Sequence, residues 1–212
     1  MKLLLTGFEP FGNSQINPSE EVVHALAEKE IDGVELFTVI LPVERFAGPD
    51  TLIRTYISVQ PDVVLSLGEA GGVTAVTIER VAINLLDFSI SDNGGHLITD
   101  KPIIADGLPA YFATLPTRQM LTALTEAGIP GQLSYSAGTF LCNQVMYEML
   151  HYIYKHQLKT SAGFVHLPQL PQQVAGKRPP LPSMSLEMMV AGVTAVIHTI
   201  NHWYTANPAH PA

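Results

Sequence analysis

Two kinds of segment alternate along the chain, distinguished by the spacing of their apolar residues. Short apolar runs typical of buried strands cover residues 2–8, 34–41, 63–67, 76–86, 132–136 and 162–166. Apolar residues at helical spacing predict helices at about 17–29, 45–59, 117–127, 140–156 and 183–203. Strands that alternate with helices predict a single α/β domain over residues 1–212, in which a mostly parallel twisted sheet carries helices on both faces in three layers.

The connecting segments are recognised by their turn residues. Asn17-Pro18 begins the first helix, with Asn17 as N-cap and the proline in the first turn. Residues 95–116 show no clear period and predict a long ordered loop or a short hairpin. Residues 167–182 contain five prolines and predict a loop, and we expect residues 205–212 to form a frayed tail.

Charge and composition exclude several classes of partner. The formal net charge is −8, from 11 basic and 19 acidic residues without any run of Lys or Arg, so neither nucleic acid nor a membrane surface is expected as a partner. No apolar run is long enough for a signal peptide or a bilayer span. The single cysteine rules out an internal disulfide and favours a reducing compartment, so we expect a cytoplasmic protein.

That cysteine, Cys142, lies in the first turn of the predicted helix that follows the fifth strand. Thr139 is the predicted N-cap of this helix. The unpaired N–H groups and the dipole at a helix start stabilise a thiolate, so the position favours a reactive nucleophile. The alternative is an unreactive thiol packed as a small buried hydrophobe.

Two further residues have positions that suit them to act with a thiol. His166 closes the apolar run 162–166, at the carboxyl end of a strand, where functional groups of parallel sheets collect; the alternative is a core histidine with satisfied hydrogen bonds. Glu79 shares a strand face with apolar residues, so it is either buried with a partner, for which an imidazole would serve, or part of a surface salt bridge. Cysteine, histidine and a carboxylate together form a generalised catalytic triad.

Other chemistry-bearing patterns are missing from the sequence. It contains no G-x-S-x-G elbow, no phosphate-binding Walker loop and no G-x-G-x-x-G after a strand. One cysteine and scattered histidines give no zinc pattern. We therefore expect neither a metal nor another cofactor.

With these residues in place, the chain resembles the pyroglutamyl peptidase I (pyrrolidone carboxyl peptidase) family of cysteine peptidases from end to end. The motifs that carry the resemblance are Leu4-Leu-Thr-Gly-Phe-Glu-Pro-Phe-Gly12, Asn17-Pro-Ser, Leu41-Pro-Val, Glu79-Arg-Val-Ala-Ile-Asn84, Asp92-Asn, Ser136-Ala-Gly-Thr-Phe-Leu-Cys-Asn143, Gly163-Phe-Val-His-Leu-Pro168 and Pro182-Ser-Met-Ser185.

The resemblance implies a Cys142–His166–Glu79 triad that removes an N-terminal pyroglutamyl residue from peptides through an acyl-enzyme, without a cofactor. It also implies a homodimer or homotetramer. The family's substrate-binding positions are carried here by Phe8, Phe11, Glu69, Ile90, Phe140 and Leu141.

The chain departs from the family pattern in two loops. Glu69 stands where the family usually has Gln, with Val73 in place of an Arg, and Ser89 stands where the family commonly has Arg. An ionised Glu only accepts hydrogen bonds, whereas Gln and Arg donate them, so these changes bear on substrate affinity. Two alternatives to the unaltered activity follow: a non-hydrolysing pyroglutamyl-peptide binding protein on the same fold, or a hydrolase with shifted specificity for another blocked N-terminus.

Overall fold

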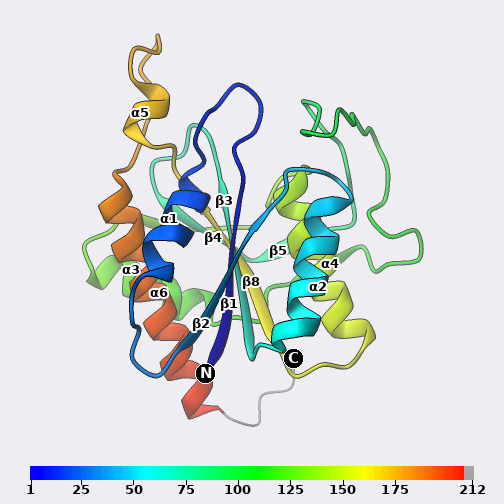
Figure 1. Cartoon of the computed structure of the whole chain (residues 1–212), viewed down its shortest axis with the longest axis vertical. Helices are drawn as coiled ribbons and strands as arrows, with labels where there is room; N and C mark the ends of the chain where they lie inside the picture. Colours follow the sequence, from blue (N-terminus) through cyan, green and yellow to red (C-terminus); the bar gives the residue numbers. More distant parts are fainter. Residues whose placement is uncertain (208–212) are drawn as a thin grey trace.

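Six strands form the central sheet, in the order β2–β1–β3–β8–β4–β7 (Figure 1). Their bounds are β1 Lys2–Phe8, β2 Glu35–Leu41, β3 Val63–Glu69, β4 Val76–Glu79, β7 Gly131–Ser134 and β8 Ser161–Leu167. All neighbouring pairs are parallel except β4 and β8, which are antiparallel. The structure is a computed structural model and describes residues 1–207.

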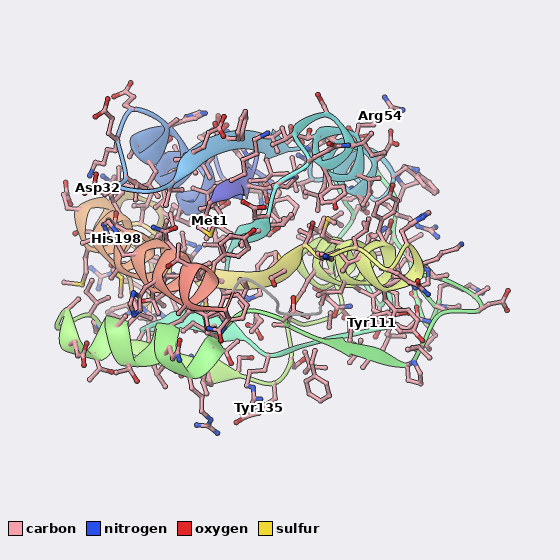
Figure 2. The ribbon with its side chains drawn as sticks, turned by 90° about the horizontal axis from the view of Figure 1, so that it is seen from below. Met1, Asp32, Arg54, Tyr111, Tyr135 and His198 are labelled. Atoms are coloured by element: carbon pink, nitrogen blue, oxygen red, sulfur yellow. The ribbon has the colours of Figure 1, made fainter. Side chains whose placement is uncertain are left out.

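Helices cover both faces of this sheet. Figure 1 shows α1 (Pro18–Ala27), α3 (Thr117–Glu126) and α6 (Leu186–Ala206) on one side, and α2 (Ala47–Val59) and α4 (Leu141–Lys155) on the other. In Figure 2, which views the molecule from below, His198 of α6 and Arg54 of α2 mark these two opposite sides. A separate cluster of buried apolar side chains fills each interface between sheet and helices. The predicted three-layer α/β fold is therefore confirmed.

The apolar run 76–86, predicted as one strand, is divided between two sheets. β4 ends at Glu79, and β5 (Val81–Ile83) pairs instead with β6 (Ala110–Phe112) in a small antiparallel sheet. The side chain of Asn143 on α4 holds β5 there: its Oδ1 accepts from the Ile83 N–H at 2.9 Å and its Nδ2 donates to the Ile83 carbonyl at 2.9 Å. The spacing of apolar residues in 76–86 does not reveal this contact, because Asn143 is distant in the sequence. The segment 95–116 is mostly a long loop, as the first alternative predicted, and it carries one short strand, β6. The partner of β6 is β5, which lies outside the segment, so the short-hairpin alternative is wrong.

Several helix boundaries also differ from the prediction. The N-cap of α4 is Phe140, because the Thr139 hydroxyl donates to the Asp87 carbonyl at 2.7 Å instead of capping the helix. A short helix, α5 (Pro171–Val174), lies within the predicted 167–182 loop. The last helix is capped by Ser185 and extends to Ala206, so the expected tail begins later than predicted. Residues 208–212 of that tail lie outside the described residues.

Gly7 on β1 marks the closest approach of the sheet to α1. A Cβ added there would lie 2.6 Å from the Ser19 carbonyl oxygen, closer than any real contact. Ser19 is fully buried, and its hydroxyl oxygen accepts a hydrogen bond from the Phe8 N–H at 2.9 Å. Only glycine therefore lets α1 sit this close to β1 and support the segment that follows Phe8.

We expect Gly7→Ala to lower the free energy of unfolding by about 1–3 kcal/mol, because the new methyl group must push α1 away from the sheet. Urea denaturation followed by circular dichroism measures this change. Gly71→Ala is the matched control, since an added Cβ at Gly71 meets nothing closer than 3.7 Å. Equal stability of Gly7→Ala and the wild-type protein would contradict the close packing.

Candidate active site

The three predicted triad residues come together at one end of the central sheet. Cys142 is the second residue of α4, His166 is the penultimate residue of β8, and Glu79 is the last residue of β4. His166 Nδ1 lies 2.8 Å from Glu79 Oε1, and Cys142 is close enough to the His166 ring to raise the pKa of that imidazole. Because a carboxylate accepts, this geometry assigns the proton on Nδ1 to the bond with Glu79.

The antiparallel pairing of β4 with β8 explains how Glu79 reaches His166. His166 is opposite Thr77 in the register, and Glu79 follows Thr77 by two residues on the same face of the strand. Glu79 and His166 are therefore diagonal neighbours across the pair. Sequence reasoning paired these residues chemically but expected a mostly parallel sheet, in which this diagonal contact is not evident.

Both members of this pair are almost completely buried. Glu79 is 2% exposed and His166 is 7% exposed. The second carboxylate oxygen of Glu79, Oε2, is buried and has no partner among residues 1–207. A buried carboxylate needs compensation, so the bond to His166 is what makes the burial of Glu79 tolerable.

The surroundings of His166 favour its charged form. Burial alone would lower its pKa, but the charge and hydrogen bond of Cys142 and the hydrogen bond and charge of Glu79 outweigh burial and raise the pKa to about 10. The imidazole therefore keeps its proton through neutral pH and loses it only in alkaline solution. An imidazole held between a cysteine and a buried carboxylate is the arrangement that nucleophilic catalysis by cysteine uses.

The start of α4 adds backbone donors beside the thiol. The N–H groups in the first turn of a helix have no intrahelical partner, and the helix dipole favours negative charge there. The N-cap residue of α4 is Phe140, whose side chain makes no hydrogen bond to these N–H groups. Gly68 at the end of β3 leaves room for the sulfur, since a Cβ there would lie 2.8 Å from Cys142 Sγ.

A mostly apolar cavity of about 180 Å³ opens next to Cys142 and His166. The remaining lining residues are Phe8, Phe11, Asn17, Val43, Glu69, Ala137, Phe140 and Leu141. The rings of Phe11 and Phe140 lie 6.2 Å apart and form part of one wall. A small, flat and largely apolar group fits this space, with its reacting atom near the sulfur.

Five of the six predicted substrate-binding residues line this cavity: Phe8, Phe11, Glu69, Phe140 and Leu141. Ile90 does not; its side chain is 45% exposed. The loop turns Phe88 inward instead, and the ring of Phe88 packs against Phe140 at 4.5 Å. Asn17, Val43 and Ala137 were missed as lining residues, although each belongs to a motif of the family resemblance that could have identified it.

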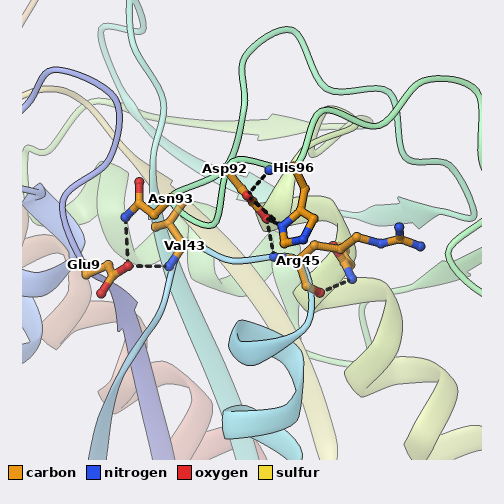
Figure 3. Close-up of polar contacts among 7 residues, drawn as sticks. Glu9, Val43, Arg45, Asp92, Asn93 and His96 are labelled. Atoms are coloured by element: carbon orange, nitrogen blue, oxygen red, sulfur yellow. Dashed lines mark hydrogen bonds and ion pairs between the residues drawn. The ribbon is translucent and has the colours of Figure 1, made fainter.

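Two carboxylates, those of Glu9 and Asp92, accept hydrogen bonds that hold neighbouring loops together (Figure 3). Glu9 Oε1 accepts from the Val43 N–H at 3.0 Å and from Asn93 Nδ2 at 2.8 Å. Asp92 accepts from the backbone N–H groups of Arg45 and His96, both at 2.7 Å. Burial raises the pKa of Asp92, but these hydrogen bonds outweigh burial and hold it below its usual value. Three separate loops are thus joined at the mouth of the site.

Other kinds of site find no support in the part of the chain that the structure describes. Among residues 1–207, no group of three or more His, Cys, Asp or Glu side chains is placed to hold a metal ion. None of the helices in the same range combines the length and the apolar character needed to cross a membrane.

Comparison with known proteins gives a consistent picture. The family model described as pyroglutamyl peptidase matches residues 1–203. The pyrrolidone-carboxylate peptidase of Vibrio vulnificus (strain CMCP6) is 46% identical over 198 residues, which cover 93% of this chain and 92% of that protein. The corresponding protein of Alkaliphilus oremlandii (strain OhILAs) is 44% identical over 198 residues, with the same coverage of 93% and 92%.

Solved structures agree with these matches. The pyrrolidone carboxyl peptidase from Thermococcus litoralis superimposes with a TM-score of 0.93 at 35% identity, covering 100% of this chain and 97% of that one. The pyroglutamyl peptidase I of Bacillus amyloliquefaciens gives a TM-score of 0.90 at 34% identity, covering 95% and 97%.

We expect Glu79→Gln to lower the pKa of His166, because the variant removes the carboxylate charge and weakens the hydrogen bond that stabilise the imidazolium. The His166 ring should then titrate at a pH about 1–3 lower than in the wild-type protein. NMR titration of the imidazole resonances measures both values. Glu126→Gln, which changes an exposed carboxylate on α3, is the control and should leave the titration unchanged. An identical His166 midpoint in Glu79→Gln would refute the role assigned to the carboxylate.

Proposed function

We propose that this chain, which belongs to the pyroglutamyl peptidase family, hydrolyses N-terminal pyroglutamyl residues from peptides with Cys142, His166 and Glu79 as its catalytic triad. The observation that carries the proposal is the buried Glu79–His166 hydrogen bond of 2.8 Å, on a histidine that also contacts the only cysteine. Membership of the family supports the activity, and the geometry supports the role that we propose for each residue.

The cavity suits the pyroglutamyl ring as a substrate group. This lactam ring is small, flat and uncharged, so an apolar slot binds it without the large cost of burying a charge. Phe8, Phe11, Phe140 and Leu141 supply apolar walls, and the cavity of about 180 Å³ limits what fits beside the thiol. An unmodified N-terminal residue, with its charged ammonium group, would be disfavoured in such surroundings.

The first chemical step is attack by the thiolate of Cys142 on the carbonyl carbon that joins the pyroglutamyl group to the next residue. The developing oxyanion lies near the N–H groups at the start of α4, including that of Cys142. Protonated His166 then gives its proton to the leaving amine as the C–N bond breaks. The peptide departs with a free amino terminus, and the pyroglutamyl group stays on the sulfur as a thioester.

The second step regenerates the thiol. His166, now neutral, takes a proton from a water molecule as that water attacks the thioester carbonyl. The C–S bond breaks, pyroglutamate leaves, and the thiolate and imidazolium pair is restored. Glu79 keeps the same orientation and tautomer of His166 through both steps, which is the role of the third group in a triad.

The proposal extends to the setting in which the enzyme works. A thiolate nucleophile must stay reduced, and cytosolic thiol systems provide that condition, so we place the protein in the cytoplasm. We also propose a homodimer or homotetramer, as the family resemblance implies. Met184 and Met189 are buried in the core, while Met188 of α6 is 43% exposed and is available to an interface. Analytical ultracentrifugation decides between these states and a monomer.

We expect the wild-type protein to release a fluorophore from a pyroglutamyl amide, and Cys142→Ala and His166→Ala to lower kcat by more than about 1,000-fold, because each removes a reacting group. A continuous fluorescence assay measures both. His202→Ala, which changes an exposed histidine on α6, is the matched control and should keep full activity. Equal release by Cys142→Ala and the wild-type protein would exclude the proposed nucleophile.

Two further measurements separate the alternatives suggested by Glu69 and Ser89. Calorimetric binding of pyroglutamate without any fluorophore release would identify a non-hydrolysing binding protein. Faster release from another N-blocked aminoacyl amide than from the pyroglutamyl amide would identify a hydrolase of shifted specificity. The first result would overturn the proposed hydrolysis, and the second would replace the proposed substrate.

A further inference from the structure

Glu69 places a carboxylate at the edge of the cavity. It is the last residue of β3 and pairs in register with Leu167 of β8, one residue after His166. Its two oxygens face donors from the chain that follows β8. Gln169 Nε2 donates to Oε1 at 3.0 Å, and Gln173 Nε2 donates to Oε2 at 2.8 Å.

Gln173 connects this carboxylate to the loop that follows β1. Its Nε2 also lies 3.1 Å from Ser14 Oγ and 3.2 Å from the Ile16 carbonyl oxygen, while its Oε1 accepts from the Leu170 N–H at 2.7 Å. Every polar atom of the Gln173 side chain is therefore engaged. One amide joins α5, the end of β3 and the 14–16 turn.

The chemistry of this cluster favours an acid at position 69. A carboxylate offers two acceptor oxygens, one for each glutamine amide, and hydrogen bonds to a charged acceptor are the stronger kind. A glutamine there would present one oxygen and one NH₂ group, so it could accept from only one of the two amides, and the other amide would have to turn its oxygen toward position 69. The change from the family's usual Gln to Glu69 thus matches the Gln169 and Gln173 amides of this chain.

We propose that Glu69 is a positioning residue that holds the ring-binding cavity closed on one side through Gln169 and Gln173, and does not itself bind the pyroglutamyl ring. The clamp, by which we mean Glu69, Gln169 and Gln173, ties the segment after His166 to the loop that carries Phe11 and Asn17. Both of these residues line the cavity. The inference rests on the proposed function of that cavity.

The clamp also determines how the negative charge affects the substrate. Each carboxylate oxygen of Glu69 accepts a hydrogen bond from one glutamine amide, which stabilises the negative charge at the edge of the cavity. Loss of the clamp frees the 14–16 turn and α5, which widens the range of conformations of the cavity wall. The expected consequence is weaker binding of the ring, with little change in chemistry at Cys142.

A double-mutant cycle on KM tests the clamp. We expect Glu69→Ala and Gln173→Ala each to raise KM for a pyroglutamyl amide by about tenfold, because each breaks the same charged hydrogen bond, with kcat within about threefold of wild type. The double variant should raise KM no more than either single variant, since the partners act as a unit. Gln172→Ala, which changes the exposed neighbour in α5, is the matched control and should leave KM unchanged.

Two outcomes would overturn the proposal. An unchanged KM in Gln173→Ala with a raised KM in Glu69→Ala would show that Glu69 contacts the ring directly. A KM increase of about 100-fold in the double variant would show independent roles, since independent effects multiply.

Hydrogen exchange gives a readout that does not depend on turnover. We expect Glu69→Ala to speed amide exchange in segments 14–17 and 169–174, and unchanged exchange would contradict the clamp whatever the catalytic result. Absence of any fluorophore release by the wild-type protein would instead count against the proposed function, so the two failures are distinguishable.

Discussion

The burial of the Glu79 carboxylate against His166 is the constraint on which the rest of the site depends. A carboxylate in this position is tolerated only because the imidazolium compensates it, and breaking such a pair by removing one partner costs about 3–5 kcal/mol. The sheet supplies the geometry, since β4 runs antiparallel to β8 and sets Glu79 diagonally beside His166. The α4 helix then places Cys142 on the same imidazole. The same hydrogen bond between Glu79 and His166 therefore stabilises the buried carboxylate and orients the imidazole beside Cys142.

Carboxylates with hydrogen-bonded oxygens organise the loops around this pair. Glu9 and Asp92 fasten the loops at the mouth of the site, and Glu69 joins the end of β3 to the segment after β8. Each carboxylate accepts hydrogen bonds from a backbone N–H or side-chain amide of another loop, so loops far apart in the sequence take fixed positions. These loops surround the mostly apolar cavity beside the thiol.

Much of this could be predicted from the sequence, because strand ends and helix starts have local signals. Cys142 and His166 were found from their places after apolar runs, and the three-layer fold followed from the alternation of strands and helices. The errors have long-range causes. Thr139 does not cap α4 because its hydroxyl bonds to Asp87, and the run 76–86 is split because Asn143 holds its second half. Ile90 is exposed because Phe88 takes the inward place. No local pattern contains these contacts.

In the proposed mechanism, Cys142 carries the pyroglutamyl group during catalysis. The most direct measurement is mass spectrometry of the wild-type protein quenched in acid within milliseconds of mixing with a pyroglutamyl ester. We expect a mass increase of one pyroglutamyl group, located by proteolytic mapping on the peptide that contains Cys142 and absent at the end of turnover. Rapid turnover with the acyl group on another residue, or with no acyl group on the protein, would contradict it.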